Sequence, residues 1–300
     1  MSRKLIGEDN RLIISSEWDS TPFYIPHPPA VLEGYVFIGM PAFASRNALL
    51  LPLAAHELGH AIWRIRSLDG PLITTAELHL RKEIEADETA FIQNFGLEQN
   101  LFFASEKDRI VSDCLKIVGS QSEELFCDLF GAALFGRSFL YAFDFFLSPG
   151  FGTREFDYPS LADRVRFMKE VTSVPESEVL NLEAIEKAGP QSRTRPLIAL
   201  ADKITGLLQP AILKNAREIA SKVEYDRQGA DTVDDLVRNL SIGIPPRRPA
   251  SPIDILNAIW TVFLRKRAAI ANFEERSKLT SLMINLCLKS LEIYEFNHLQ

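Results

Sequence analysis

The stretch HELGH, residues 56–60, constrains the fold more than any other feature of this 300-residue chain. It lies within NALLLPLAAHELGHAIWRIRSL, residues 47–68, an apolar, helix-favouring run with no glycine before Gly59. Residues four apart lie on the same face of a helix, so His56 and His60 are expected to project side by side. Two histidines on one face of an apolar helix predict a metal site inside the fold.

The chemistry of this motif favours zinc. Histidine nitrogens are common zinc ligands, and a hydrolytic zinc site has three protein ligands and one open position. Zinc lowers the pKa of a bound water to about 7, and Glu57 is placed beside His56 to take a proton from that water. We therefore expect one Zn²⁺ per chain, with Glu57 as the general base.

Two stretches compete to supply the third ligand, because His79 lies in a polar segment. Glu83 and Asp87 are four residues apart in KEIEADETA, and Glu124 and Asp128 are four apart in EELFCDLFG. Charged neighbours surround Glu83, so a solvated, ion-paired face explains that stretch without a metal. Apolar neighbours surround Glu124, where an uncompensated carboxylate would be costly to bury. We favour Glu124 and keep Glu83 as the alternative.

The residues near Glu124 have expected supporting roles. Asp128, one turn later, is expected to hydrogen-bond a ligand imidazole and fix its orientation. Glu123 is expected to face solvent or to lie behind the ligands. Gly131 and the alanines after it allow this helix to approach the HELGH helix closely.

These motifs together resemble the gluzincin group of zinc peptidases. HELGH, then ELFCDLFG, then YPSLADR is similar to a pattern of HExxH, ExxAD-xx-G and a later His-Pro before an arginine. The resemblance covers roughly residues 35–170. It implies a zincin-like fold with zinc on His56, His60 and Glu124, Glu57 as the base, and Asp128 behind a histidine.

One departure from the pattern concerns Tyr158, which stands where the pattern often has histidine. A tyrosine phenol can donate a hydrogen bond to an oxyanion, although Tyr158-Pro159 is also a plain turn before a helix, the interpretation we favour. Arg164 is either a substrate-binding residue or a partner of Asp157 or Asp163. The stretch with Glu83 is also similar to small regulatory metallopeptidases that cleave repressors, but FIQNFGLE does not continue that pattern.

Charge and composition exclude several function classes. The net charge is −7 and the basic clusters are short, so no nucleic-acid partner is expected. Residues 129–147 are apolar, but Arg137, Asp144 and Gly136 favour two buried helices over a membrane span. Three sparse cysteines and a polar N-terminus favour a cytoplasmic protein.

The pattern along the chain predicts an α+β fold that is mainly α. Strands are expected at 11–15 and 35–40, in a small N-terminal antiparallel sheet, and helices at 74–95, 105–118 and 121–147. We expect a zincin-like catalytic domain over residues 1–175. Residues 176–300 are expected to form a C-terminal helical domain with segments near 195–226, 252–271 and 274–297, which offer a surface for a protein partner.

Two hypotheses of function follow. The first is a zinc metallopeptidase that hydrolyses peptide bonds of a peptide or protein substrate, with Glu57 activating zinc-bound water. The alternative is a regulatory or interaction protein whose zinc-stabilised peptidase fold is weakly active or inactive.

Overall fold

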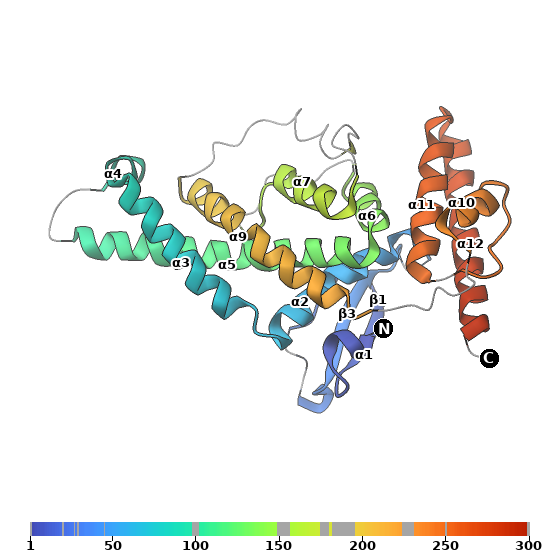
Figure 1. The fold of residues 1–300 in the computed structure, drawn as a ribbon, viewed down its shortest axis with the longest axis horizontal. Helices are drawn as coiled ribbons and strands as arrows, with labels where there is room; N and C mark the ends of the chain where they lie inside the picture. The colour runs from blue at the N-terminus through green and yellow to red at the C-terminus, as the bar shows by residue number, and fades with distance from the viewer. Residues whose placement is uncertain are drawn as a thin grey trace.

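The computed structural model describes residues 2–19, 21–26, 28, 30–44, 46–97, 102–148, 157–174, 180–181, 196–223, 231–249 and 251–298. Over these residues the protein is mainly helical, with one small sheet near the N-terminus. Figure 1 shows an elongated molecule in which the long helix α5 runs through the middle, α3 and α4 lie toward one end, and α10, α11 and α12 lie at the other.

The helices of the first half are α1 (Ser2–Ile6), α2 (Ala54–Ile65), α3 (Asp69–Ala86), α4 (Glu88–Phe95), α5 (Phe103–Phe135), α6 (Arg137–Leu147) and α7 (Leu161–Thr172). Those of the second half are α9 (Pro196–Ala220), α10 (Val233–Ser241), α11 (Pro252–Ala268) and α12 (Phe273–His298). Two short 3₁₀ helices, η1 (Ala30–Leu32) and η2 (Ala48–Leu53), lie before α2.

The sheet has three strands in the order β1 (Arg11–Glu17), β3 (Tyr35–Pro41) and β2 (Phe23–Tyr24). It is mixed, so the expected antiparallel sheet is wrong for its main pair: β1 runs parallel to β3 along its whole length, and only β2 is antiparallel. The physical reason is the connection of residues 18–34, which is long enough for the crossover that parallel strands need. It carries the chain past β3 to form β2 on the far side.

Helix α5 is the centre of the packing, with α2, α3, α7 and α9 against it. The approach of α2 is close at Gly59, where an added Cβ would lie 2.9 Å from the Cα of Cys127. No larger residue fits there without moving a backbone. Trp63 and Phe126 extend the same contact, with ring centroids 5.4 Å apart.

The expected break in residues 129–147 is present at Gly136, where α5 ends and α6 begins. Gly136 has φ 62° and ψ −140°, a conformation that favours glycine. The side chain of Asn257 on α11 spans the break. It donates to the carbonyl of Phe135 at 2.9 Å and accepts from the backbone amide of Ser138 at 2.9 Å. The C-terminal helices are thereby joined to the region that holds α5.

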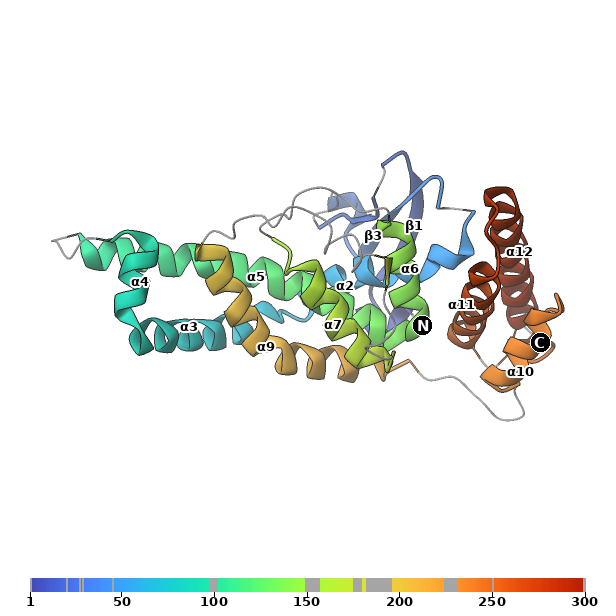
Figure 2. The ribbon, with the colours of Figure 1, turned by 90° about the horizontal axis from the view of Figure 1, so that it is seen from above.

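Helix α9 comes from the second half of the chain but packs along α5 and α3 (Figure 2). By length and composition it is the one helix among the described residues that is long and apolar enough to cross a membrane, with 28% of its most apolar window buried. The expected absence of a membrane span stays a prediction. The predicted domain boundary between residues 175 and 176 lies outside the described residues.

Candidate metal centre

The two histidines of the motif lie on α2 as the spacing predicts. Both imidazoles turn toward α5, and their side chains are 14% and 16% exposed for His56 and His60. The rings meet edge to face with centroids 5.1 Å apart. Tyr24 of β2 stacks on the outer side of His60, with centroids 6.4 Å apart and planes within 6°. The sheet therefore covers one side of the pair.

The carboxylate that reaches both histidines is Glu124, from α5. One of its oxygens, Oε2, lies 3.2 Å from Nε2 of His56, and the other, Oε1, lies 3.6 Å from Nε2 of His60. Oε2 is buried, and apart from this ion pair with His56 it has no hydrogen-bond partner among the described residues. Three ligand atoms converge around a position where a cation would compensate the carboxylate, so the residues present fit a zinc ion.

The alternative ligand, Glu83, lies elsewhere. It belongs to α3 and forms an ion pair with Lys203 of α9 at the surface. That pairing is the solvated arrangement that its charged neighbours indicate. Glu124 lies beside both histidines and Glu83 does not, so Glu83 is not part of this cluster.

Each of the two histidines also has a carboxylate beside its Nδ1 atom. Nδ1 of His56 lies 3.0 Å from Oδ1 of Asp128, and Nδ1 of His60 lies 2.8 Å from Oε1 of Glu123. A carboxylate at Nδ1 places the proton there and leaves Nε2 free to bind metal. Both Nε2 atoms face Glu124, so the two pairs orient the histidines for one ion.

Arg164 of α7 is bound to Asp128 rather than to the expected Asp157 or Asp163. Its Nε and Nη2 donate to the two carboxylate oxygens at 2.6 and 2.9 Å, and both side chains are buried. Asp163 instead pairs with Arg166. With these contacts, Arg164 holds the carboxylate that orients His56.

The pKa values of the buried groups agree with this ion pair between Arg164 and Asp128. Burial alone would raise the pKa of Asp128, but the charge of Arg164 and the hydrogen bonds from His56 and Arg164 outweigh it and lower the pKa to about 2. Burial likewise favours a lower pKa for His56, yet its contacts with Asp128 and Glu124 raise that pKa to about 10. Without metal, a proton on His56 thus neutralises part of the negative charge at the site.

Tyr158 contributes its ring to this region. The guanidinium of Arg164 lies between two aromatic rings, with its carbon 5.1 Å from the centroid of Tyr158 and 5.0 Å from that of Phe143. The carbonyl of Tyr158 accepts a 3.5 Å hydrogen bond from the amide of Gln121. The turn at Tyr158 therefore helps to fix Arg164 in place, which agrees with its interpretation as a turn.

The proposed base, Glu57, is 7% exposed and next to both histidines. Burial raises the pKa of its carboxyl, while His56 and His60 lower it, and the net direction is upward. A carboxylate with a raised pKa holds a proton more tightly than an exposed one. Among the described residues its side chain has no hydrogen-bond partner, so the oxygens are free to accept a proton.

Cys127 of α5 brings a sulfur atom close to the two histidines. His56, His60 and Cys127 each offer a ligand atom, and these atoms lie within 4.8 Å of one another, so this group could hold a metal. The thiol is completely buried against Gly59, and burial raises its pKa well above the ordinary value. Cys127 is therefore a second candidate for the third position, beside Glu124.

Comparison with known proteins adds no assignment: no protein-family model, curated protein or solved structure matches the chain. The function must therefore be argued from the site itself.

Proposed function

We propose that the chain is a zinc-dependent metallopeptidase with a zincin-like catalytic region. The observation that carries the proposal is the position of the Glu124 carboxylate beside the Nε2 atoms of both His56 and His60, at 3.2 and 3.6 Å. His56, His60 and Glu124 would hold one Zn²⁺.

Zinc supplies Lewis acidity when bound, which lowers the pKa of water and stabilises charge on a carbonyl oxygen. Glu57 would accept a proton on its carboxylate from the attacking water and pass it to the nitrogen of the leaving amine. Burial of Glu57 supports this role, because it raises the pKa of the carboxyl. Asp128 and Glu123 keep the imidazoles aligned throughout.

Two of the site's other residues have narrower roles. Arg164 donates from two of its nitrogens to Asp128. Its role would therefore be to position Asp128 rather than to contact the substrate. The cleft would lie on the Nε2 side of the histidines. Strand β3 is paired on both sides, so it is β2, beside His60, that offers a free edge near the site.

The test compares the wild-type chain with Glu57→Gln and with the double variant His56→Ala, His60→Ala. Metal content is measured by mass spectrometry and cleavage with a quenched fluorescent casein. We expect about one zinc per chain in wild type and in Glu57→Gln, cleavage only in wild type, and neither zinc nor cleavage in the double variant. Equal cleavage by wild type and Glu57→Gln would overturn the proposal.

The alternative function is a regulatory or interaction protein built on the same zinc site. Exposed apolar side chains on the C-terminal helices favour it, Phe273 and Phe296 being 85% and 63% exposed. In that case wild type and Glu57→Gln would bind zinc equally and neither would cleave. A partner captured through α12 would then carry the function.

A further inference from the structure

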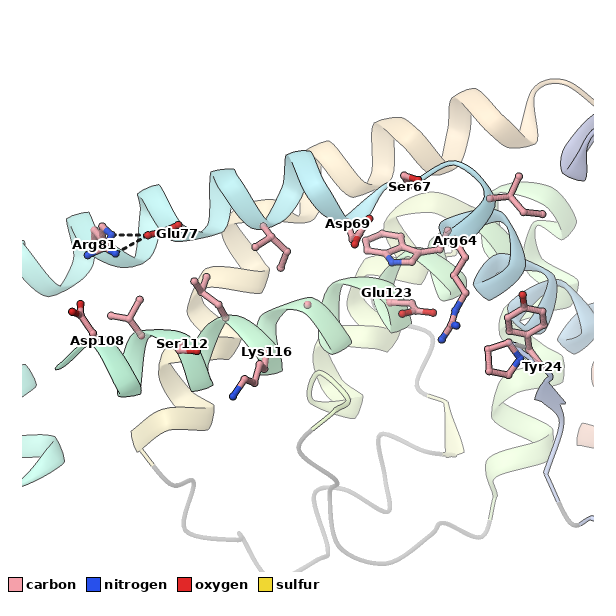
Figure 3. Close-up of a pocket in the computed structure, with 17 residues that line it drawn as sticks. Tyr24, Arg64, Ser67, Asp69, Glu77, Arg81, Asp108, Ser112, Lys116 and Glu123 are labelled. Carbon is pink, nitrogen blue, oxygen red and sulfur yellow. Dashed lines mark hydrogen bonds and ion pairs between the residues drawn. The ribbon is translucent and has the colours of Figure 1, made fainter. Parts of the chain in front are cut away.

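A groove of about 1200 Å³ lies between α3 and α5 (Figure 3). Figure 3 shows Arg81 and Asp108 at one end, and Glu123, Arg64 and Tyr24 at the other. Glu123 is the residue that accepts the hydrogen bond from Nδ1 of His60. The groove therefore ends at a side chain that orients a metal ligand.

The dimensions suit an extended chain better than a small molecule. Small-molecule pockets usually hold about 300–1,000 Å³. Along α3 the lining reaches from Asp69 to Arg81, about 18 Å at the helical rise of about 1.5 Å per residue. An extended polypeptide covers that distance with about five or six residues.

The end of the groove near Glu123 offers backbone recognition. Tyr24 and Pro26 line it, and Tyr24 belongs to β2, which is at the edge of the sheet. One side of β2 pairs with β3, and no strand lies on its other side among the described residues. A free strand edge binds extended polypeptides through main-chain hydrogen bonds.

The lining has apolar and acidic parts that select the side chains of an occupant. Ile73 of α3 and Leu115 of α5 are among the apolar residues of the lining. Asp69 and Asp108 make no hydrogen bond or ion pair within the described part of the chain. In contrast, two of the three basic side chains in the lining already form ion pairs with carboxylates.

Arg81 pairs with Glu77 at 2.7 Å, and Lys116 pairs with Asp113 at 3.0 Å. Arg64 lies over the ring of Tyr24, 5.8 Å from its centroid. Over the whole lining there are four carboxylates, on Asp69, Glu77, Asp108 and Glu123, and three cations, on Arg64, Arg81 and Lys116, so the lining has a net charge of −1. The groove is complementary to basic side chains.

We propose that this groove binds an extended polypeptide segment that carries basic side chains, and that the segment contacts Glu123. The binding site stands on the groove alone, whereas its link to the metal rests on the proposed function. A cationic side chain at Glu123 competes with Nδ1 of His60 for the carboxylate. The bound segment therefore weakens zinc binding, and zinc weakens binding of the segment by the same factor.

The test uses the full chain with Glu57→Gln, so that the probe is not cleaved. Fluorescein-labelled hexapeptides Ala-Arg-Ala-Ala-Arg-Ala, Ala-Glu-Ala-Ala-Glu-Ala and Ala-Gln-Ala-Ala-Gln-Ala are titrated and followed by fluorescence anisotropy. We expect the arginine peptide to bind at least tenfold more tightly than the glutamate peptide. Adding Asp69→Asn and Asp108→Asn should weaken its binding by about threefold to tenfold, because two ion pairs are lost.

The matched control is Glu275→Gln with Glu295→Gln, which changes the net charge equally on α12. It should leave binding within twofold. Equal binding of the three peptides, or equal weakening by both double variants, overturns the inference. A second variant, Leu115→Trp, narrows the groove without changing charge and should also weaken binding.

The link to the metal is measured separately, by chelator competition for zinc with and without the arginine peptide. We expect the peptide to weaken zinc binding at least threefold in Glu57→Gln, but not after Asp69→Asn and Asp108→Asn. Unchanged zinc affinity with the peptide bound refutes the link. Zinc binding and casein cleavage without peptide binding refute the groove but leave the proposed function intact. Peptide binding by a chain that neither holds zinc nor cleaves casein refutes the proposed function but leaves the groove as a binding site.

Discussion

The two histidines of the candidate metal centre have the same chemistry but different surroundings. Behind His56, Asp128 is 0% exposed and is held by both donor nitrogens of Arg164. Behind His60, the Glu123 side chain is 23% exposed and lines a groove. One carboxylate is part of the core, and the other borders solvent.

This difference teaches that orienting a ligand and stabilising the fold are separable tasks. Asp128 does both, because removing it leaves Arg164 charged and buried. Glu123 only orients, because water can replace it. Mutations at the two positions should therefore differ much more in stability than in metal affinity.

The largest expected effect is that of Asp128→Ala. It should lower the free energy of unfolding by about 3–5 kcal/mol, because it leaves the guanidinium of Arg164 buried without its partner. Urea denaturation of the metal-free chain measures this. The double variant Asp128→Ala, Arg164→Met is the control. It should be more stable than Asp128→Ala alone, and failure to regain stability would show that the pair is not the cause.

The next largest effect is expected at Gly59. The histidines lie on α2 and their carboxylate partners on α5, so the centre depends on the contact between these two helices. Gly59→Ala should destabilise the chain by about 1–3 kcal/mol, because the new Cβ meets Cys127 at 2.9 Å. Gly70→Ala is the control, since nothing lies within 4 Å of its Cβ position. It should be neutral or stabilising by up to about 1 kcal/mol. Equal thermal shifts in the two variants would contradict the close contact.

The sequence predicts the side chains that come together at the candidate metal centre better than it predicts the residues that support them. Helical spacing is enough to bring His56 and His60 together, and apolar neighbours distinguish Glu124 from Glu83. The partner of Arg164, in contrast, could not be predicted from the sequence. Local spacing favours Asp157 or Asp163, whereas the actual partner, Asp128, lies on another helix, and no periodicity links α5 to α7.

The helix boundaries show the same limit. Residues 74–95 predict one helix, but the structure has α3 and α4, divided at Asp87. The side chain of Asp87 accepts a hydrogen bond from the amide of Ala90 at 2.9 Å and caps the start of a new helix. This local cap decides where the helix begins, although the spacing of the apolar residues continues across it. Helix α10 was not expected, although Thr232 and Asp235 form a capping box that could have indicated it.

A smaller effect is expected for Glu123→Gln, which sharpens the comparison directly. Zinc affinity should fall by about tenfold to a hundredfold, because a neutral amide is a weaker acceptor for Nδ1 of His60. Chelator competition measures this. The free energy of unfolding without metal should change by less than about 0.5 kcal/mol, since the side chain borders solvent. A loss of stability as large as that of Asp128→Ala would remove the distinction between the two carboxylates.

The smallest effect is expected for Tyr158→Phe, which keeps the ring over Arg164 and removes only the phenol. If the ring supports the Asp128 side of the centre, zinc content stays at wild-type level and the cleavage rate stays within about threefold. Tyr158→Leu, which also removes the ring, should lower stability by about 0.5–1 kcal/mol through the lost contact with the guanidinium. A fall in rate of about a hundredfold or more in Tyr158→Phe, with zinc retained, would instead identify the phenol as an oxyanion donor. The Asp128 side of the centre would then take part in the reaction itself.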